Sequence, residues 1–132
     1  MKGIRKYSGL AMVCGVLLAG AVFAQAPGIK RNIVQRGDVS FPGHEAVIAS
    51  VEIAPGASAG RHTHPGEEIS YVMDGEGELM ITGQPTRKIK AGDGFIVPAN
   101  TIHDAHNTGS KPLKLAAVYY VEKGKPMATP AP

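Results

Sequence analysis

Apolar and polar positions alternate in short runs along most of the chain, and no long window keeps a helical period. Alternation with a period of two is typical of a strand that places one face in a core. The segment EAVIASVEI (45–53) has this pattern, with the inward positions Val47, Ala49, Val51 and Ile53. The segment LKLAAVYYVE (113–122) repeats it, with the inward positions Leu113, Leu115, Ala117 and Tyr119.

Further short strands are predicted between these two segments, separated by glycine and proline. ISYVMDGEGELMIT (69–82) reads as two strands around a turn at 74–77, which predicts a hairpin. TGQPTR marks a second turn, and TRKIKAG and GFIVP each predict a strand. Many short strands at close spacing favour an all-β sandwich or small barrel in a single domain.

The N-terminus predicts a secretory signal peptide over residues 1–24. Lys2, Arg5 and Lys6 precede an apolar run from Leu10 to Phe23, which is short for a membrane span of ~20 residues. We expect cleavage after Ala24 and a periplasmic or secreted location, without a stable membrane anchor. An uncleaved anchor helix is the alternative.

Cleavage would change the charge of the chain. Removing three basic residues reduces the 14 Lys and Arg to 11, which equals the 11 Asp and Glu. A formally neutral chain without a basic stripe argues against a nucleic-acid partner. The single cysteine, Cys14, would also be removed, so the mature fold must be stabilised by its core and not by disulfides.

The segment RHTHPGEE (61–68) contains candidate metal ligands. His62 and His64 are two residues apart and share one side of an extended chain, and Glu68 can return to that side after Pro65 and Gly66. His103 follows another strand and another proline. Imidazole and carboxylate together suit a divalent Fe, Mn, Ni, Cu or Zn ion. Two surface histidines in a polar loop are the alternative, and spacing alone does not decide between them.

Two longer patterns resemble the cupin family. The first, G-x5-H-x-H-x3-E-x6-G, runs from Gly56 to Gly75 through the histidines and glutamate named above. The second, G-x5-P-x-G-x2-H-x3-N, runs from Gly92 to Asn107 and departs only at Asn100, which replaces a glycine. Asn tolerates a left-handed backbone better than most residues, so we expect the turn to be kept.

This resemblance implies a double-stranded β-helix, or jelly-roll barrel, that holds one divalent transition metal through His62, His64, Glu68 and His103. We expect an N-terminal lead and first strand over 25–36, the cupin barrel over 37–122 and a flexible tail over 123–132. The whole exported domain resembles small single-domain bacterial cupins described as quercetin-dioxygenase-like. Such a likeness transfers the fold and the metal site but not a substrate.

The neighbours of these residues are interpreted by strand parity. Glu67 and His106 fall on the face away from the metal, and Arg61 is expected at a charged rim. His44 is assigned a structural role. Ser70 and Val72, in phase with Glu68, are expected in the cavity wall.

Two functions remain open. The chain is either a metal-dependent, dioxygenase-like enzyme acting on a small organic molecule, or a non-catalytic periplasmic module that binds a small molecule or a metal. The sequence shows no phosphate-binding loop, because GDGFIV lacks the required Lys and Ser or Thr. We also expect a homodimer that covers exposed strand edges, formed through residues 118–121 and the segment before Val47.

Export can be tested directly. Protein recovered from the exported fraction is expected to begin at Gln25, because signal peptidase favours small residues such as Val22 and Ala24 before the cut. Intact mass and N-terminal sequencing measure this. Exported protein that still carries Met1 would contradict the prediction.

Overall fold

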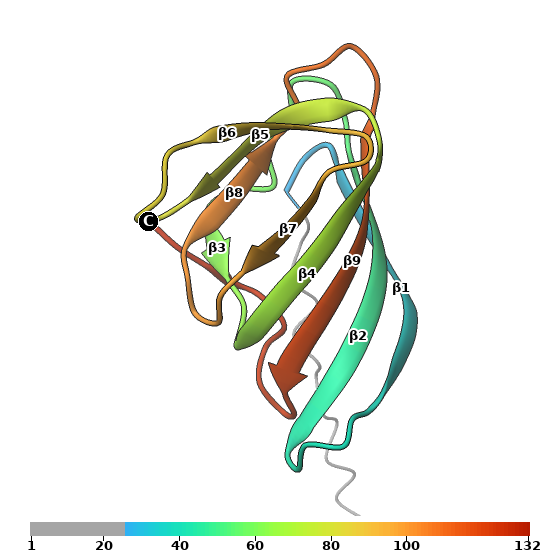
Figure 1. The fold of residues 1–132 in the computed structure, drawn as a ribbon, viewed down its shortest axis with the longest axis vertical. Coiled ribbons are helices and arrows are strands. Elements are labelled where there is room, and N and C mark those ends of the chain that lie inside the picture. Colours follow the sequence, from blue (N-terminus) through green and yellow to red (C-terminus); the bar gives the residue numbers. More distant parts are fainter. Residues whose placement is uncertain (1–25) are drawn as a thin grey trace, which may run out of the picture.

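Two antiparallel β-sheets pack against each other in the computed structural model, which describes residues 26–132 (Figure 1). The first sheet has the order β1-β2-β9-β4-β7 and the second the order β10-β3-β8-β5-β6. The strands are β1 (Ile29–Asp38), β2 (His44–Ile53), β3 (His62–Thr63), β4 (Gly66–Asp74), β5 (Glu76–Ile81), β6 (Arg87–Lys90), β7 (Gly94–Val97), β8 (His103–His106), β9 (Leu113–Glu122) and β10 (Thr129–Pro130). The all-β prediction is confirmed.

The ends of the chain bear on the predicted export. The predicted signal peptide, residues 1–24, lies outside the described residues. Over residues 26–132 we find no helix of the length and apolar character needed to cross a membrane.

The core lies between the sheets and is built by the alternation seen in the sequence. β2 and β9 pair along their whole length, from His44 opposite Glu122 to Ile53 opposite Leu113. Their inward faces therefore line up and are buried, as predicted. The second sheet adds further buried residues, which are Leu79, Ile81, Ile89 and Ala105.

The connection between β4 and β5 is not the predicted hairpin. β4 pairs with β7 and β9, whereas β5 pairs with β6 and β8, so the two strands lie in different sheets. Gly75 joins them with φ of 83°, a conformation that glycine adopts without strain. A Cβ atom there would lie only 2.6 Å from the Pro112 carbonyl oxygen. The sequence shows this turn, but only packing against the second sheet decides where the next strand pairs.

The C-terminal segment, residues 123–132, contains a short strand. Thr129 and Pro130 form β10, which pairs with Thr63 and His62 of β3. Figure 1 shows the segment leaving β9 and crossing to the second sheet. A strand of two residues is too short to show an alternating pattern, so the sequence gives no signal for β10. Its pairing depends on the neighbouring strand β3.

A close approach between β4 and β9 fixes the position of Glu68. Gly66 pairs with Val121, and a Cβ atom on it would lie 1.8 Å from the Tyr120 carbonyl oxygen. Only glycine allows this backbone contact. Two residues later, Glu68 is held opposite Tyr119 with its side chain turned inward.

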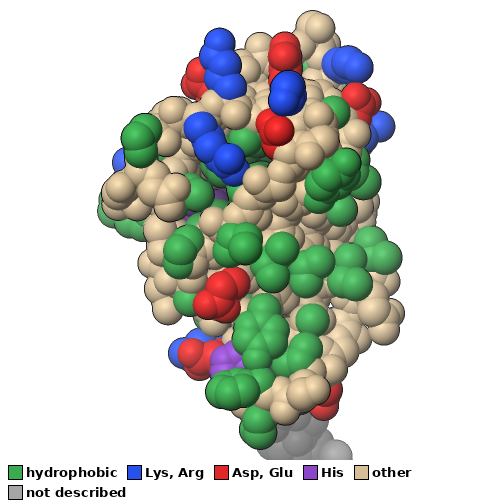
Figure 2. Space-filling view, viewed as in Figure 1, with side chains coloured by type: hydrophobic (Ala, Val, Ile, Leu, Met, Phe, Trp, Pro, Cys, Tyr) green, Lys and Arg blue, Asp and Glu red, His purple; other side chains and the backbone are tan. Residues whose placement is uncertain are grey.

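The outer face of the first sheet carries an apolar row. Ile48, Val118, Ile69 and Ile96 lie in register across β2, β9, β4 and β7. Three of them are isoleucines with 41% to 60% of their surface exposed. Figure 2 shows apolar side chains grouped on this side of the molecule. β9 lies inside the sheet, so it does not offer the strand edge that the sequence suggested for a dimer; β1 and β7 are the edges.

Candidate metal centre

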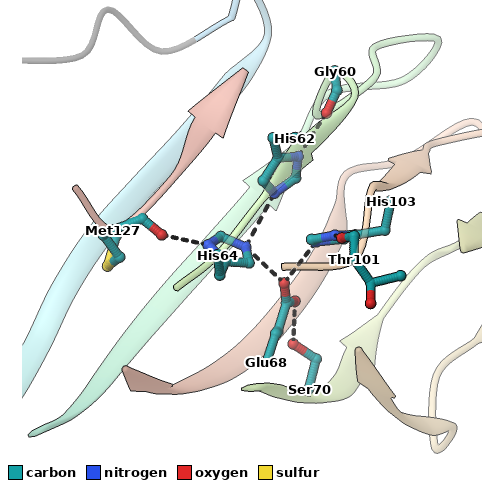
Figure 3. Close-up of polar contacts among 8 residues, drawn as sticks. All are labelled: Gly60, His62, His64, Glu68, Ser70, Thr101, His103 and Met127. Carbon is teal, nitrogen blue, oxygen red and sulfur yellow. Dashed lines mark hydrogen bonds and ion pairs between the residues drawn. The ribbon is translucent and has the colours of Figure 1, made fainter. Parts of the chain in front are cut away.

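Four buried side chains meet inside the barrel, and we call them the donor set: His62, His64, Glu68 and His103. Each offers one nitrogen or oxygen atom, and these atoms all lie within 4.8 Å of one another. His62 on β3 pairs directly with His103 on β8, and Glu68 reaches in from β4 of the other sheet. The structure thus brings together all four residues that the sequence singled out (Figure 3).

The outer ring nitrogens of the three histidines all contact backbone carbonyl oxygens. Nδ1 of His62 lies 2.6 Å from the Gly60 oxygen, and Nδ1 of His103 lies 2.9 Å from the Thr101 oxygen. Nδ1 of His64 lies 2.5 Å from the Met127 oxygen. A carbonyl oxygen only accepts, so each Nδ1 must carry the hydrogen. In the neutral imidazoles, Nε2 is then a free acceptor that points into the centre.

The inner atoms are spaced as ligands of one ion would be. The Nε2 atoms of His62 and His64 are 3.1 Å apart, and Oε2 of Glu68 lies 3.1 Å from Nε2 of both His64 and His103. Two donors that each lie about 2.1 Å from one ion at a right angle are about 3.0 Å apart. Acceptor atoms this close repel each other unless a cation lies between them. The donor set therefore fits a divalent transition metal.

The pKa shifts of His62 and Glu68 agree with a metal site. Burial lowers the pKa of His62 to about 4, and the nearby His103 adds to the effect. Burial alone would raise the pKa of Glu68, but hydrogen bonds from His103 and His64 outweigh it and lower the pKa. At neutral pH the centre therefore offers a neutral imidazole and a carboxylate, the forms that bind metals.

His103 behaves differently. Burial lowers its pKa, but the hydrogen bond and the charge of Glu68 outweigh burial, so the pKa is raised. In the absence of metal, a proton on Nε2 of His103 would place a positive charge next to Glu68. A metal has to displace that proton, so its affinity falls as the pH decreases.

A small space adjoins the donor set, and we call it the chamber. Its free volume is ≈ 20 Å³, which is room for about one water molecule. Apolar side chains form most of its wall, and the polar exceptions besides the donors are Arg31 and Tyr119. Burial, with the charge of Glu68, raises the pKa of Tyr119, so its hydroxyl stays protonated.

Two asparagines of the second sequence pattern, Asn100 and Asn107, support the site through hydrogen bonds. Asn100 has φ of 57°, the left-handed conformation expected for it, and its N–H donates to the His64 carbonyl at 2.9 Å. Asn107 is fully buried, and its side-chain amide donates to the carbonyls of Ile53 and Lys111. These two residues connect the loop carrying His103 to the rest of the barrel.

The sequence model of the family described as Cupin domain matches residues 49–125. The chain belongs to the cupin family. The resemblance to cupins seen in the two sequence patterns is therefore confirmed.

Two relatives of this cupin illustrate its place in the family. An oxalate-binding protein of Thermotoga maritima is 38% identical over 54% of this chain and 60% of its own length. Germin-like protein subfamily 2 member 2 of Arabidopsis thaliana is 28% identical over 89% of this chain and 50% of its own length. The chain thus spans about half to three fifths of these relatives.

The fold is shared with solved structures. A protein with a double-stranded β-helix domain from Klebsiella pneumoniae superposes with a TM-score of 0.64 at 22% identity, covering 77% of this chain and 84% of its own. At that identity the likeness shows the fold alone. The predicted jelly-roll architecture is confirmed.

The residues set aside by parity lie where parity placed them. His106 and Arg61 are exposed, and Glu67 is half-buried on the outer side of β4. His44 stacks on Tyr120 with ring centroids 5.3 Å apart, on the outer face of the first sheet. Ser70 and Val72 were expected in the cavity wall, but neither lines the chamber. Ser70 is buried and donates to Oε1 of Glu68 at 2.7 Å, and Val72 is fully buried.

Sequence reasoning missed two parts of the site. Arg31 turns inward because it pairs with the buried Val51, a relation that only the β1–β2 register reveals. Met127 reaches His64 from 63 residues away. Neither position carries a sequence signal, because each acquires its role through strand pairing.

The donor set predicts a contrast between two histidines on the same strand. His103→Ala is expected to weaken divalent metal binding by at least about 10- to 100-fold, since loss of a supporting contact alone costs that much. His62→Ala and His64→Ala should behave alike. His106→Ala is the matched control and should retain metal. Elemental analysis and competition with a chelator measure the difference, and equal losses in the two β8 variants would show that the donor set is wrongly assigned.

Proposed function

We propose that this chain is an exported metal-dependent cupin that binds a small organic acid next to a divalent transition metal and oxidises it in a dioxygenase-like reaction. The observation that carries the proposal is the presence of Arg31 in the same small chamber as the donor set. A guanidinium beside a metal presents two positive groups to one small ligand. A carboxylate is the ligand that such a pair recognises best.

The chamber limits the size and orientation of the ligand. Its walls are mainly apolar and come from both sheets, including Val51, Leu79, Phe95 and Leu115. The free volume of ≈ 20 Å³ holds about one water molecule, so the walls must move apart to admit a ligand, and a ligand of few heavy atoms requires the smallest movement. The relative at 38% identity is named an oxalate-binding protein, and oxalate is a small dicarboxylate of this kind.

The chemistry divides between the metal and the chain. A bound divalent metal supplies Lewis acidity and, if redox-active, reaction with dioxygen. The donor set would hold the ion through four side chains and would leave room in its coordination for a ligand or dioxygen. Arg31 orients the ligand carboxylate, the apolar walls exclude water, and Glu68 is the group in the chamber that can accept a proton.

Capture without turnover is the second candidate. Apart from the donor set, the ionisable groups that line the chamber are Arg31 and Tyr119. Arginine stays charged, and the raised pKa of Tyr119 keeps its hydroxyl protonated. No further wall residue can therefore act as a general base, which suits a binding module.

Arg31→Gln tests the proposal. The protein is loaded with each of Fe²⁺, Mn²⁺, Ni²⁺, Cu²⁺ and Zn²⁺ and titrated with small carboxylic acids and with neutral analogues of the same size. Loss of a charge-assisted hydrogen bond should weaken acid binding by about 10- to 100-fold, with metal content unchanged. Isothermal titration calorimetry measures binding, and an oxygen electrode with mass spectrometry measures turnover.

Lys30→Gln is the matched control, because Lys30 loses the same charge on the same strand but is exposed. Equal binding of acids and neutral analogues, or an unchanged affinity in Arg31→Gln, would contradict the proposal. Binding without oxygen consumption or product would support the binding module.

We further propose a homodimer that buries the apolar row on the first sheet. Ile69→Lys, in the middle of that row, is expected to convert a dimer to a monomer in multi-angle light scattering at micromolar concentration. Lys88→Ala on the second sheet is the control. A monomeric wild-type protein would exclude this interface.

A further inference from the structure

The C-terminal segment supports β3, the strand that carries His62 and ends one residue before His64. β3 has only two residues, His62 and Thr63, and its pairing with β8 is a single register position, His62 opposite His103. On its other side, β10 pairs with both residues of β3. The Ala131 N–H then donates to the Arg61 carbonyl at 2.9 Å. The segment therefore supplies much of the backbone pairing of β3.

His64 depends on this segment in a way that the other two histidines do not. His62 and His103 each use the carbonyl two residues before them, at Gly60 and Thr101, as the acceptor for Nδ1. These contacts are local and form with the loop itself. The acceptor for His64 is the carbonyl of Met127, 63 residues away. Figure 3 shows Met127 approaching His64 from the side opposite Glu68.

The contacts that hold the segment are few and close to its two ends. Near its start, the Lys123 N–H donates to the Gly43 carbonyl at 2.9 Å, and the Lys123 ammonium lies 2.7 Å from Asp38. Near its end lies the two-residue β10. In between, the Met127 side chain is partly buried against the core. A segment with so few buried contacts opens at low free-energy cost compared with the barrel.

We propose that residues 124–132 are a part of the metal centre: the Met127 carbonyl positions His64 as a ligand, and opening of the segment sets the rate at which metal enters and leaves. Met127 acts as a positioning residue through its backbone, because its hydrogen bond selects the tautomer in which Nε2 of His64 faces the other donors. This inference rests on the proposed metal site, but it requires no particular substrate or reaction. Outer contacts of this kind orient ligands and tune metal affinity.

Three variants separate the carbonyl from the rest of the segment. Truncation after Lys125 removes the Met127 carbonyl and β10 together. Ala131→Pro keeps the carbonyl but removes the N–H that donates to Arg61. Met127→Ala is the matched control, because it shortens the side chain and keeps the backbone carbonyl.

Cobalt(II) is the probe for metal retention, measured as transfer to a chelator and as the visible spectrum of the bound ion. Truncation should weaken affinity and speed release by about 10- to 100-fold and shift the spectrum, as the His64 ligand becomes misoriented. Ala131→Pro should speed release by a smaller factor. Met127→Ala should match the wild type in spectrum and release rate.

A second measurement uses metal-free protein, so that it remains decisive if the chain binds no cobalt. Histidine-ring ¹⁵N–¹H spectra should show the Nδ1–H of His64 protected from solvent in the wild type and in Met127→Ala, and lost or exchanging fast in the truncated chain. Absence of cobalt binding by the wild type would refute the proposed function. The ring spectra test the role of Met127 separately, because they need no bound metal. Wild-type ring spectra and release rates in a folded truncated chain would overturn the inference. If truncation prevents folding, a wild-type release rate in Ala131→Pro would overturn it. Equal damage by Met127→Ala would assign the effect to side-chain packing and overturn it as well.

Discussion

The structure depends on how the imidazoles of His62, His64 and His103 are oriented in the buried interior. Each Nδ1–H donates outward to a carbonyl, so each neutral Nε2 turns a lone pair inward, where the Glu68 carboxylate also points. Burying acceptors against one another is unfavourable unless a cation neutralises them. A proton on His103 partly does so, and a divalent metal would do so fully. This requirement explains why so polar a cluster is stable inside an otherwise apolar barrel.

The fold serves this arrangement by bringing donors from both sheets to one point. His62 and His103 belong to the second sheet and Glu68 belongs to the first. An ion held by all of them would cross-link the two sheets through their shared interior. The close approach at Gly66 and the change of sheet at Gly75 set the depth of Glu68 and the direction of the chain after it. Gly66 and Gly75, which both lie within the first sequence pattern, are therefore structural requirements of the site.

The chamber, in contrast, determines which ligands could reach the donor set. A barrel of this kind accommodates many reactions, and the residues beside the metal select among them. Here those residues are an arginine, a protonated tyrosine and apolar walls. That combination favours a small anionic ligand and leaves few proton acceptors. The C-terminal segment adds a second level of control, since it contacts the centre from outside the barrel and does not line the chamber.

Local patterns in the sequence indicated the strands and the inward faces of β2 and β9, and the resemblance to the two cupin patterns singled out the residues of the donor set. Alternation and the spacing of His62, His64 and Glu68 depend on residues close in the chain, so they are readable without a structure. Tertiary structure alone decided that β4 and β5 belong to different sheets, that Arg31 enters the chamber and that Met127 supports His64. Each of these depends on pairing between strands distant in sequence, where a shift of one residue reverses the side-chain direction. The tail, residues 123–132, carries no strand pattern in the sequence, and its two-residue strand β10 forms because β3 offers an edge to pair with.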